Sequence, residues 1–126
     1  MELGITGKNA LVGGATKGLG KACALQLADT GVNIPICAKG AGSLNEAATE
    51  IRNKSKVKVL PIQSDLAKSE EVKSVVAQTL STFGSIDILI VNSGGPSPGK
   101  FFELAEQDWR TLISPCCYMW LNYIAL

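Results

Sequence analysis

Residues 10–20 read ALVGGATKGLG, a short apolar run followed by a glycine-rich turn. Three of its glycines, Gly14, Gly18 and Gly20, have the spacing GxxxGxG. This pattern is typical of a strand that turns into a helix, with one glycine for the turn, one for close approach of a pyrophosphate and one for packing of the helix on the strand. The amides and the positive dipole at the start of that helix would hold the phosphates. The stretch therefore predicts a dinucleotide-binding turn.

Two alternatives to this interpretation exist. A strand-turn-helix that binds no ligand also uses glycine at its bends. The phosphate loop of nucleoside triphosphatases needs a glycine five residues before Gly20 and a Ser or Thr after Lys21, where this chain has Ala15 and Ala22. The phosphate loop is therefore excluded.

The chain has 126 residues, of which 46% are hydrophobic and 18% charged, and its formal net charge is +1. These values fit one globular domain. We expect residues 1–126 to form a single dinucleotide-binding domain. Basic and acidic residues are spread along the chain, so neither nucleic acid nor an anionic membrane is an expected partner.

The N-terminal residues MELGITGKNALV have no basic region followed by a long apolar stretch. No run reaches the roughly 18 apolar residues that cross a bilayer. We therefore expect a cytoplasmic protein without a membrane segment.

Four cysteines, at 23, 37, 116 and 117, form no CxxC pair, and the chain has no histidine. We expect no metal site, and we expect Cys23 and Cys37 to be buried free thiols. Without histidine, Ser-His-Asp and Cys-His catalysis are excluded.

Short apolar runs at 9–13, 32–38, 57–63 and 86–91 alternate with helical patterns, which predicts βαβ units with a parallel sheet. Pro35 cannot donate a hydrogen bond, so we expect local irregularity in the second strand. Gly31 and Gly84 are expected to end the first and third helices. The buried stripes of these two helices are predicted to be Leu19, Ala22, Cys23, Leu27 and Ala28, and Val72, Val75, Val76, Leu80 and Phe83.

Further motifs follow the glycine turn in a fixed order: SDL at 64–66, DILIVNSG at 87–94, GPSPG at 95–99 and QDW at 107–109. With these motifs the chain resembles the short-chain dehydrogenase/reductases from about Ile5 to Leu112, and within them the 3-oxoacyl-(acyl-carrier-protein) reductase branch. The resemblance implies an α/β fold with a Rossmann-type doubly wound parallel sheet. About four strands are expected here, in the order 3-2-1-4. By this resemblance, residues 1–126 would form a single, partial domain with an atypical apolar tail at 113–126.

The resemblance also implies cofactor contacts. In the family, an Asp at the position of Asp65 binds the adenine amino group, and the amide at Leu66 lies against the ring. Asn92 corresponds to the second Asn of the family's NNAG motif, beside the nicotinamide ribose. The implied cofactor-binding residues are Gly14, Thr16, Lys17, Gly18, Leu19, Gly20, Lys39, Asp65, Leu66, Asn92, Ser93 and Gly94.

Structural roles are open for two of these residues. Asp65 is also suited to be a helix N-cap, and Asn92 to be a turn stabiliser. The family usually has Thr where this chain has Gly13, which removes a hydrogen bond that supports the turn.

The charge of the residues near the adenosine ribose distinguishes a site for NAD from a site for NADP. An NAD site has a carboxylate about twenty residues after the glycine turn, and no Asp or Glu occurs between Asp29 and Glu46. Lys39 lies in that interval and Lys17 lies in the turn, and both are suited to bind a 2′-phosphate. NADP is therefore the expected cofactor and NAD the less favoured one, although both lysines could instead be ordinary surface charges.

The family's catalytic residues, a Ser and a YxxxK pair, have no counterpart in this sequence. Lys100 is the last lysine, and Tyr118 is followed four residues later by Asn122. The family's helical Asn would fall at Cys116. We therefore assign no catalytic residue, and we expect these residues alone to have no reductase activity.

Residues 116–126 are almost entirely apolar and no longer resemble the family. An unrelated reading frame, a truncated gene and an apolar partner-binding helix all explain them. The fourth strand would lack its outer neighbour, so we expect a homo-oligomer, an aggregate or association with a full-length relative.

Three functions fit the sequence. The first is an NADP-dependent reductase or dehydrogenase that acts on a small carbonyl compound or an acyl thioester and works only in a longer form. The second is a non-catalytic dinucleotide-binding or interaction protein. The third is a remnant without function.

Overall fold

A computed structural model describes residues 2–93 and 98–113. The chain alternates strands and helices through most of this length. The elements are β1 (Ala10–Gly13), α1 (Gly18–Asp29), β2 (Ile34–Ala38), α2 (Ala41–Lys54), β3 (Val59–Gln63), α3 (Ser69–Phe83), β4 (Ile88–Ile90), the 3-10 helix η1 (Phe101–Glu103) and α4 (Glu106–Ile113). Within these ranges, no helix has both the length and the apolar character that a membrane span requires.

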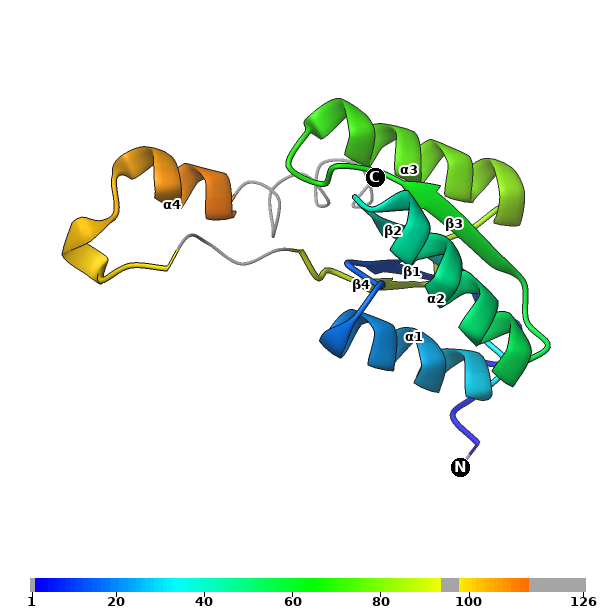
Figure 1. The fold of residues 1–126 in the computed structure, drawn as a ribbon. Helices are drawn as coiled ribbons and strands as arrows, with labels where there is room; N and C mark the ends of the chain where they lie inside the picture. The colour runs from blue at the N-terminus through cyan, green and yellow to red at the C-terminus, as the bar shows by residue number, and fades with distance from the viewer. Residues whose placement is uncertain (1, 94–97, 114–126) are drawn as a thin grey trace.

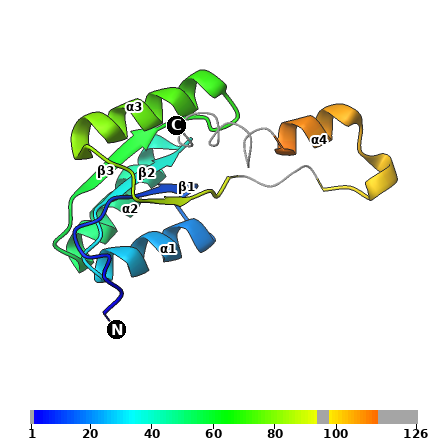
Figure 2. The ribbon, with the colours of Figure 1, turned by 180° about the vertical axis from the view of Figure 1, so that it is seen from behind.

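The four strands form one parallel sheet in the order β3-β2-β1-β4. Helices α1 and α2 cover one face of the sheet and α3 covers the other (Figures 1 and 2). The expected doubly wound α/β fold and its strand order are confirmed. Because the strands are parallel, the segments that follow them meet at one edge of the sheet.

Strands β1 and β2 are buried on both faces, which explains their continuous apolar runs. Side chains alternate along β1: Val12 belongs to the core that includes α1 and α2, whereas Leu11 belongs to the core that includes α3. The two cores fix the direction in which β1 enters the turn at Gly13.

The predicted stripe of α1 is wrong for Leu19 and Ala22. Both are exposed, Leu19 by 80%, and the buried residues of the helix are Gly20, Ala24 and Ala28. Small residues on this face let the helix axis approach the sheet closely, and Leu at position 19 points away from it. Gly31 adopts a φ of +81° after the helix, as expected for its end.

Helix α3 buries Val72, Val75 and Val76 as predicted, but Leu80 is 44% exposed and Thr79 takes the buried position. The Thr79 hydroxyl donates to the Val75 carbonyl over 2.8 Å, so its burial leaves no unpaired polar group. Gly84 ends the helix with a φ of +83°.

Pro35 disturbs β2 on one side only. Pairing with β3 continues through it, opposite Leu60. Pairing with β1 consists of an isolated bridge at Asn33 and then resumes at Ile36. The irregularity expected of a residue without an N–H is therefore confined to the side that faces β1.

The described cysteines are free thiols. Cys37 is buried, and burial raises the pKa of its thiol to about 12. Cys23 is half-buried rather than buried. Cys116 and Cys117 lie outside the described residues.

Candidate functional site

Two glycines give the turn after β1 its shape. Gly14 has a φ of +57° and Gly18 a φ of +59°, a region that side chains with a Cβ rarely adopt. A Cβ placed on Gly18 would meet no atom of residues 2–93 or 98–113 within 4 Å. The backbone at Gly18 is therefore open to approach by another molecule.

Gly20 has a different role. A Cβ at this position would run into the Gly14 carbonyl oxygen and would lie 2.9 Å from the Gly13 carbonyl oxygen. The first turn of α1 is thus in direct contact with the backbone at the end of β1. Gly14 shapes the turn and Gly20 allows this packing, as their spacing predicts. Gly18 leaves the backbone open, and its contact with a pyrophosphate stays a prediction.

Asn92, two residues after β4, lies against the same turn. Its Nδ2 donates to the carbonyl oxygens of Gly13 and Gly14, each over 3.3 Å. A Cβ on Gly13 would lie 2.7 Å from the Asn92 carbonyl oxygen. Glycine in place of the family's Thr therefore makes room for the chain after β4. Sequence reasoning missed this contact, because only the fold brings the two segments together.

The first residues of α1 are exposed and include no acidic side chain. Lys17 is the N-cap residue, no side chain caps the helix, and the first turn contains no acidic residue. The positive dipole end is consequently available to an anion. Of the other predicted residues in this segment, Thr16 is half-buried and Leu19 is exposed.

Asp65 begins a tight turn after β3. Its Oδ1 accepts a hydrogen bond from the Ala67 amide at 3.0 Å, and its own amide donates to Glu71 Oε2 at 2.5 Å. The pKa of its carboxyl lies below the ordinary value, first because of the Ala67 amide and also because of the nearby Lys39 ammonium. Since α3 begins at Ser69 with Lys68 as its N-cap, the alternative role of Asp65 as a helix N-cap is wrong.

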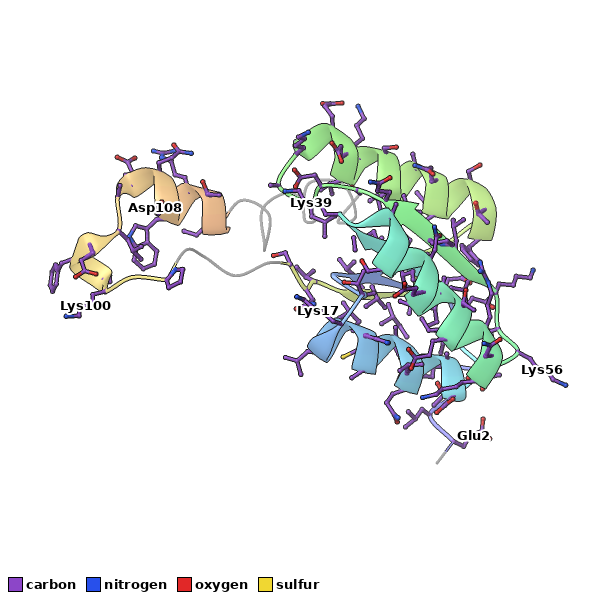
Figure 3. The ribbon with its side chains drawn as sticks, in the orientation of Figure 1. Glu2, Lys17, Lys39, Lys56, Lys100 and Asp108 are labelled. Carbon is purple, nitrogen blue, oxygen red and sulfur yellow. The ribbon has the colours of Figure 1, made fainter. Side chains whose placement is uncertain are left out.

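Lys39, the residue after β2, forms an ion pair with Asp65. Its Nζ lies 3.5 Å from Asp65 Oδ2, and its side chain is 78% exposed. Its carbonyl oxygen accepts a hydrogen bond from Gln63 Nε2 at 3.1 Å. Lys17 and Lys39 lie on the same side of the domain, and Lys56 lies at the far side (Figure 3). The sequence predicted Lys39 and Asp65 as separate ligands and did not anticipate their pairing.

Leu66 and Ser93, two further residues of the predicted site, are both at least partly buried. The Leu66 side chain is 8% exposed and belongs to the core beneath α3, where it anchors the turn at Asp65. Ser93 is half-buried. Gly94 lies outside the described residues. The fold thus gathers segments that follow all four strands at the carboxyl edge of the sheet.

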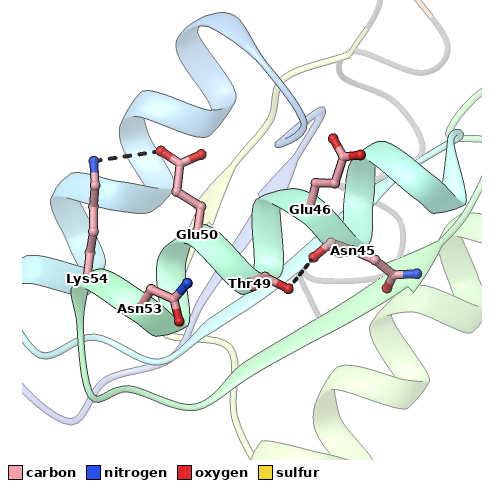
Figure 4. A pocket seen from close by; sticks show the side chains of 6 residues that line it. All are labelled: Asn45, Glu46, Thr49, Glu50, Asn53 and Lys54. Carbon is pink, nitrogen blue, oxygen red and sulfur yellow. Dashed lines mark hydrogen bonds and ion pairs between the residues drawn. The ribbon is translucent and has the colours of Figure 1, made fainter.

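A depression on the surface of α2 contains none of the predicted residues. Figure 4 shows that its lining comes from α2 alone, with Glu50 paired to Lys54. Glu50 also pairs with Lys21 of α1, which lowers the pKa of the Glu50 carboxyl. The lining residues are Asn45, Glu46, Thr49, Glu50, Asn53 and Lys54. These contacts join two helices, and the depression lies apart from the carboxyl edge.

Comparison with known proteins identifies the family. The model of the short chain dehydrogenase family matches residues 8–117. The chain belongs to this family.

Relatives of known sequence agree with the assignment to the short-chain dehydrogenases. The 3-oxoacyl-(acyl-carrier-protein) reductase of Staphylococcus epidermidis is 37% identical over 106 residues, which are 84% of this chain and 43% of that protein. Dehydrogenase/reductase SDR family member 4 of Caenorhabditis elegans is 37% identical over 107 residues, 84% of this chain and 41% of that protein. The chain spans less than half the length of these relatives.

Solved structures of short-chain dehydrogenases and related enzymes share the fold. L-sorbose reductase from Gluconobacter frateurii, complexed with NADPH and L-sorbose, aligns with a TM-score of 0.90 and 33% identity over 99% of this chain and 49% of that one. An alcohol dehydrogenase from Thermococcus sibiricus, complexed with 5-hydroxy-NADP, aligns with a TM-score of 0.84 and 26% identity over 94% of this chain and 52% of that one.

Proposed function

We propose that these residues form the NADP(H)-binding part of a short-chain dehydrogenase/reductase. The observation that supports this most directly is the carboxyl edge of the sheet. There the open backbone at Gly18 directly follows Lys17 in the chain. The side chain of Lys17 lies on the same side of the domain as that of Lys39. The similarity to reductases solved with NADPH or an NADP derivative supports the same cofactor.

Each group has a role suited to its chemistry. The uncapped start of α1 would bind the pyrophosphate, because its amides and dipole favour an anion. Lys17 and Lys39 would bind the 2′-phosphate, and Asp65 would accept a hydrogen bond from the adenine amino group. Asn92 would hold the glycine turn in place through its hydrogen bonds to the carbonyl oxygens of Gly13 and Gly14.

A bound nicotinamide supplies hydride transfer to or from a carbonyl carbon. The sequence has no YxxxK pair, and its last lysine is Lys100. We therefore propose that these 126 residues bind the cofactor and do not themselves carry out the proton transfer. Four properties stay predictions from the sequence: the class of substrate, the association into an oligomer, the atypical character of the tail at 113–126 and the cytoplasmic location.

Calorimetric titration of the full chain with NADPH and NADH tests the proposal. NADPH should bind more tightly than NADH. Lys39→Met should weaken NADPH binding about ten- to hundredfold, since a charge-assisted hydrogen bond contributes about 1.5–3 kcal/mol. Lys56→Met removes an equal charge at the far side of the domain and should change affinity by less than about twofold.

A folded chain that binds neither nucleotide contradicts the cofactor assignment. Equal losses in the two lysine variants contradict the role of Lys39, because the effect would then come from net charge alone.

A further inference from the structure

The two carboxylate oxygens of Asp65 have separate partners. Oδ1 accepts from the Ala67 amide and closes the turn after β3, whereas Oδ2 lies 3.5 Å from the Lys39 ammonium. The structural contact and the charged contact are therefore made by different atoms. Only the second faces the side chain that the proposed function assigns to a 2′-phosphate.

Asp65 is the fixed partner in this pair. Its amide donates to Glu71 Oε2, and the other oxygen of Glu71 pairs with Lys68 over 3.2 Å. The side chain of Asp65 is 21% exposed, and that of Lys39 is 78% exposed. Lys39 is anchored through its carbonyl oxygen by Gln63, which leaves its long side chain free to turn. Any change of partner therefore requires movement of Lys39 rather than of Asp65.

We propose that Asp65 is a specificity-determining residue that lowers the preference for NADP(H) over NAD(H) by competing with the 2′-phosphate for Lys39. This inference rests on the proposed function. NADH has no 2′-phosphate, so it binds without disturbing the ion pair. NADPH must draw Lys39 away from Asp65 or share it, and the ion pair is lost or weakened in the complex.

The size of the effect follows from the exposure of the pair. Exposed ion pairs contribute little, and the loss of one such pair corresponds to a change in affinity of about two- to fivefold. Asp65 therefore moderates the preference for NADP(H) and does not reverse it.

A double-mutant cycle on the full chain tests the inference. The measured quantity is the dissociation constant of NADH divided by that of NADPH, so a higher ratio means a stronger preference for NADPH. Contacts that the two cofactors share, including the adenine contact of Asp65, cancel in this ratio. Asp65→Asn keeps the oxygen that accepts from Ala67 and removes the negative charge. It should raise the ratio about two- to fivefold.

In a Lys39→Met background, Asp65→Asn should leave the ratio unchanged, because no ammonium is left to compete for. An equal rise in that background would overturn the inference, since it would show direct repulsion between Asp65 and the phosphate. No rise in either background would overturn it as well.

Binding of the two cofactors to the wild-type chain distinguishes failure of the proposed function from failure of this inference. If it binds neither cofactor, the proposed function fails and the inference fails with it. If it prefers NADPH and Asp65→Asn does not raise the ratio, the proposed function stands and only the inference is refuted.

Discussion

Replacing Gly20 by alanine tests how closely α1 packs on the end of β1. Gly20 lies in the first turn of α1, and a Cβ there would run into the Gly14 carbonyl oxygen and lie 2.7 Å from Asn92 Nδ2. Gly42 provides a matched control, because it lies in the first turn of α2 and a Cβ there would meet none of the described residues within 4 Å. Neither glycine has a positive φ.

The difference between the two variants isolates the steric cost. Alanine is favoured over glycine in a helix by about 0.5–1 kcal/mol, and this gain applies to both sites. Overpacking costs about 1–3 kcal/mol. The atoms opposite Gly20 include backbone oxygens at the end of a buried strand, which cannot rotate away as a flexible side chain would. Gly20→Ala should therefore be about 1–3 kcal/mol less stable than Gly42→Ala.

Urea unfolding followed by far-ultraviolet circular dichroism gives the free energy of unfolding of each variant and of the wild-type chain. Gly42→Ala should equal or exceed the wild type in stability, and Gly20→Ala should fall below it. A difference between the variants smaller than about 0.5 kcal/mol would refute the close packing described for the turn.

Two further predictions concern single side chains. Asn92→Asp should destabilise the chain more than Asn92→Ala, because a carboxylate oxygen would face the carbonyls of Gly13 and Gly14, to which Nδ2 now donates. Urea unfolding curves that place the two variants in the reverse order would contradict this prediction. Cys23 should react with a maleimide faster than Cys37, whose thiol is buried with a pKa raised to about 12; peptide mass spectrometry of partly labelled protein measures both rates, and equal rates would show that Cys37 is accessible.

Much of the fold could be predicted because its signals are local. The apolar runs placed β1 to β4 within two residues of their observed ends. Gly31 and Gly84, which both adopt a positive φ, follow the ends of their helices as expected. The predictions for Leu19 and Leu80 failed for one reason. Periodicity shows that a helix has an apolar face, but the residues that face the sheet depend on how closely the helix approaches it.

The sequence predicted which residues would lie near the carboxyl edge of the sheet, and it did not predict the contacts between them. Lys39 and Asp65 were each expected near the cofactor, yet their ion pair joins residues 39 and 65, which the order of β2 and β3 places side by side. Gly13 was interpreted as a lost hydrogen bond. The structure shows that it makes room for the backbone of Asn92, which follows Gly13 by 79 residues in the chain.

The sequence by itself determined the alternation of strands and helices, the glycine turn after the first strand and the absence of an acidic residue after the second. Each of these depends on residues close together in the chain, where backbone preference and apolar spacing act directly. Only the tertiary structure decided which glycine stays open, which helix face is buried and which carboxylate oxygen meets Lys39. These depend on distances between segments from different strands, and such distances are set by packing of the whole sheet and its helices.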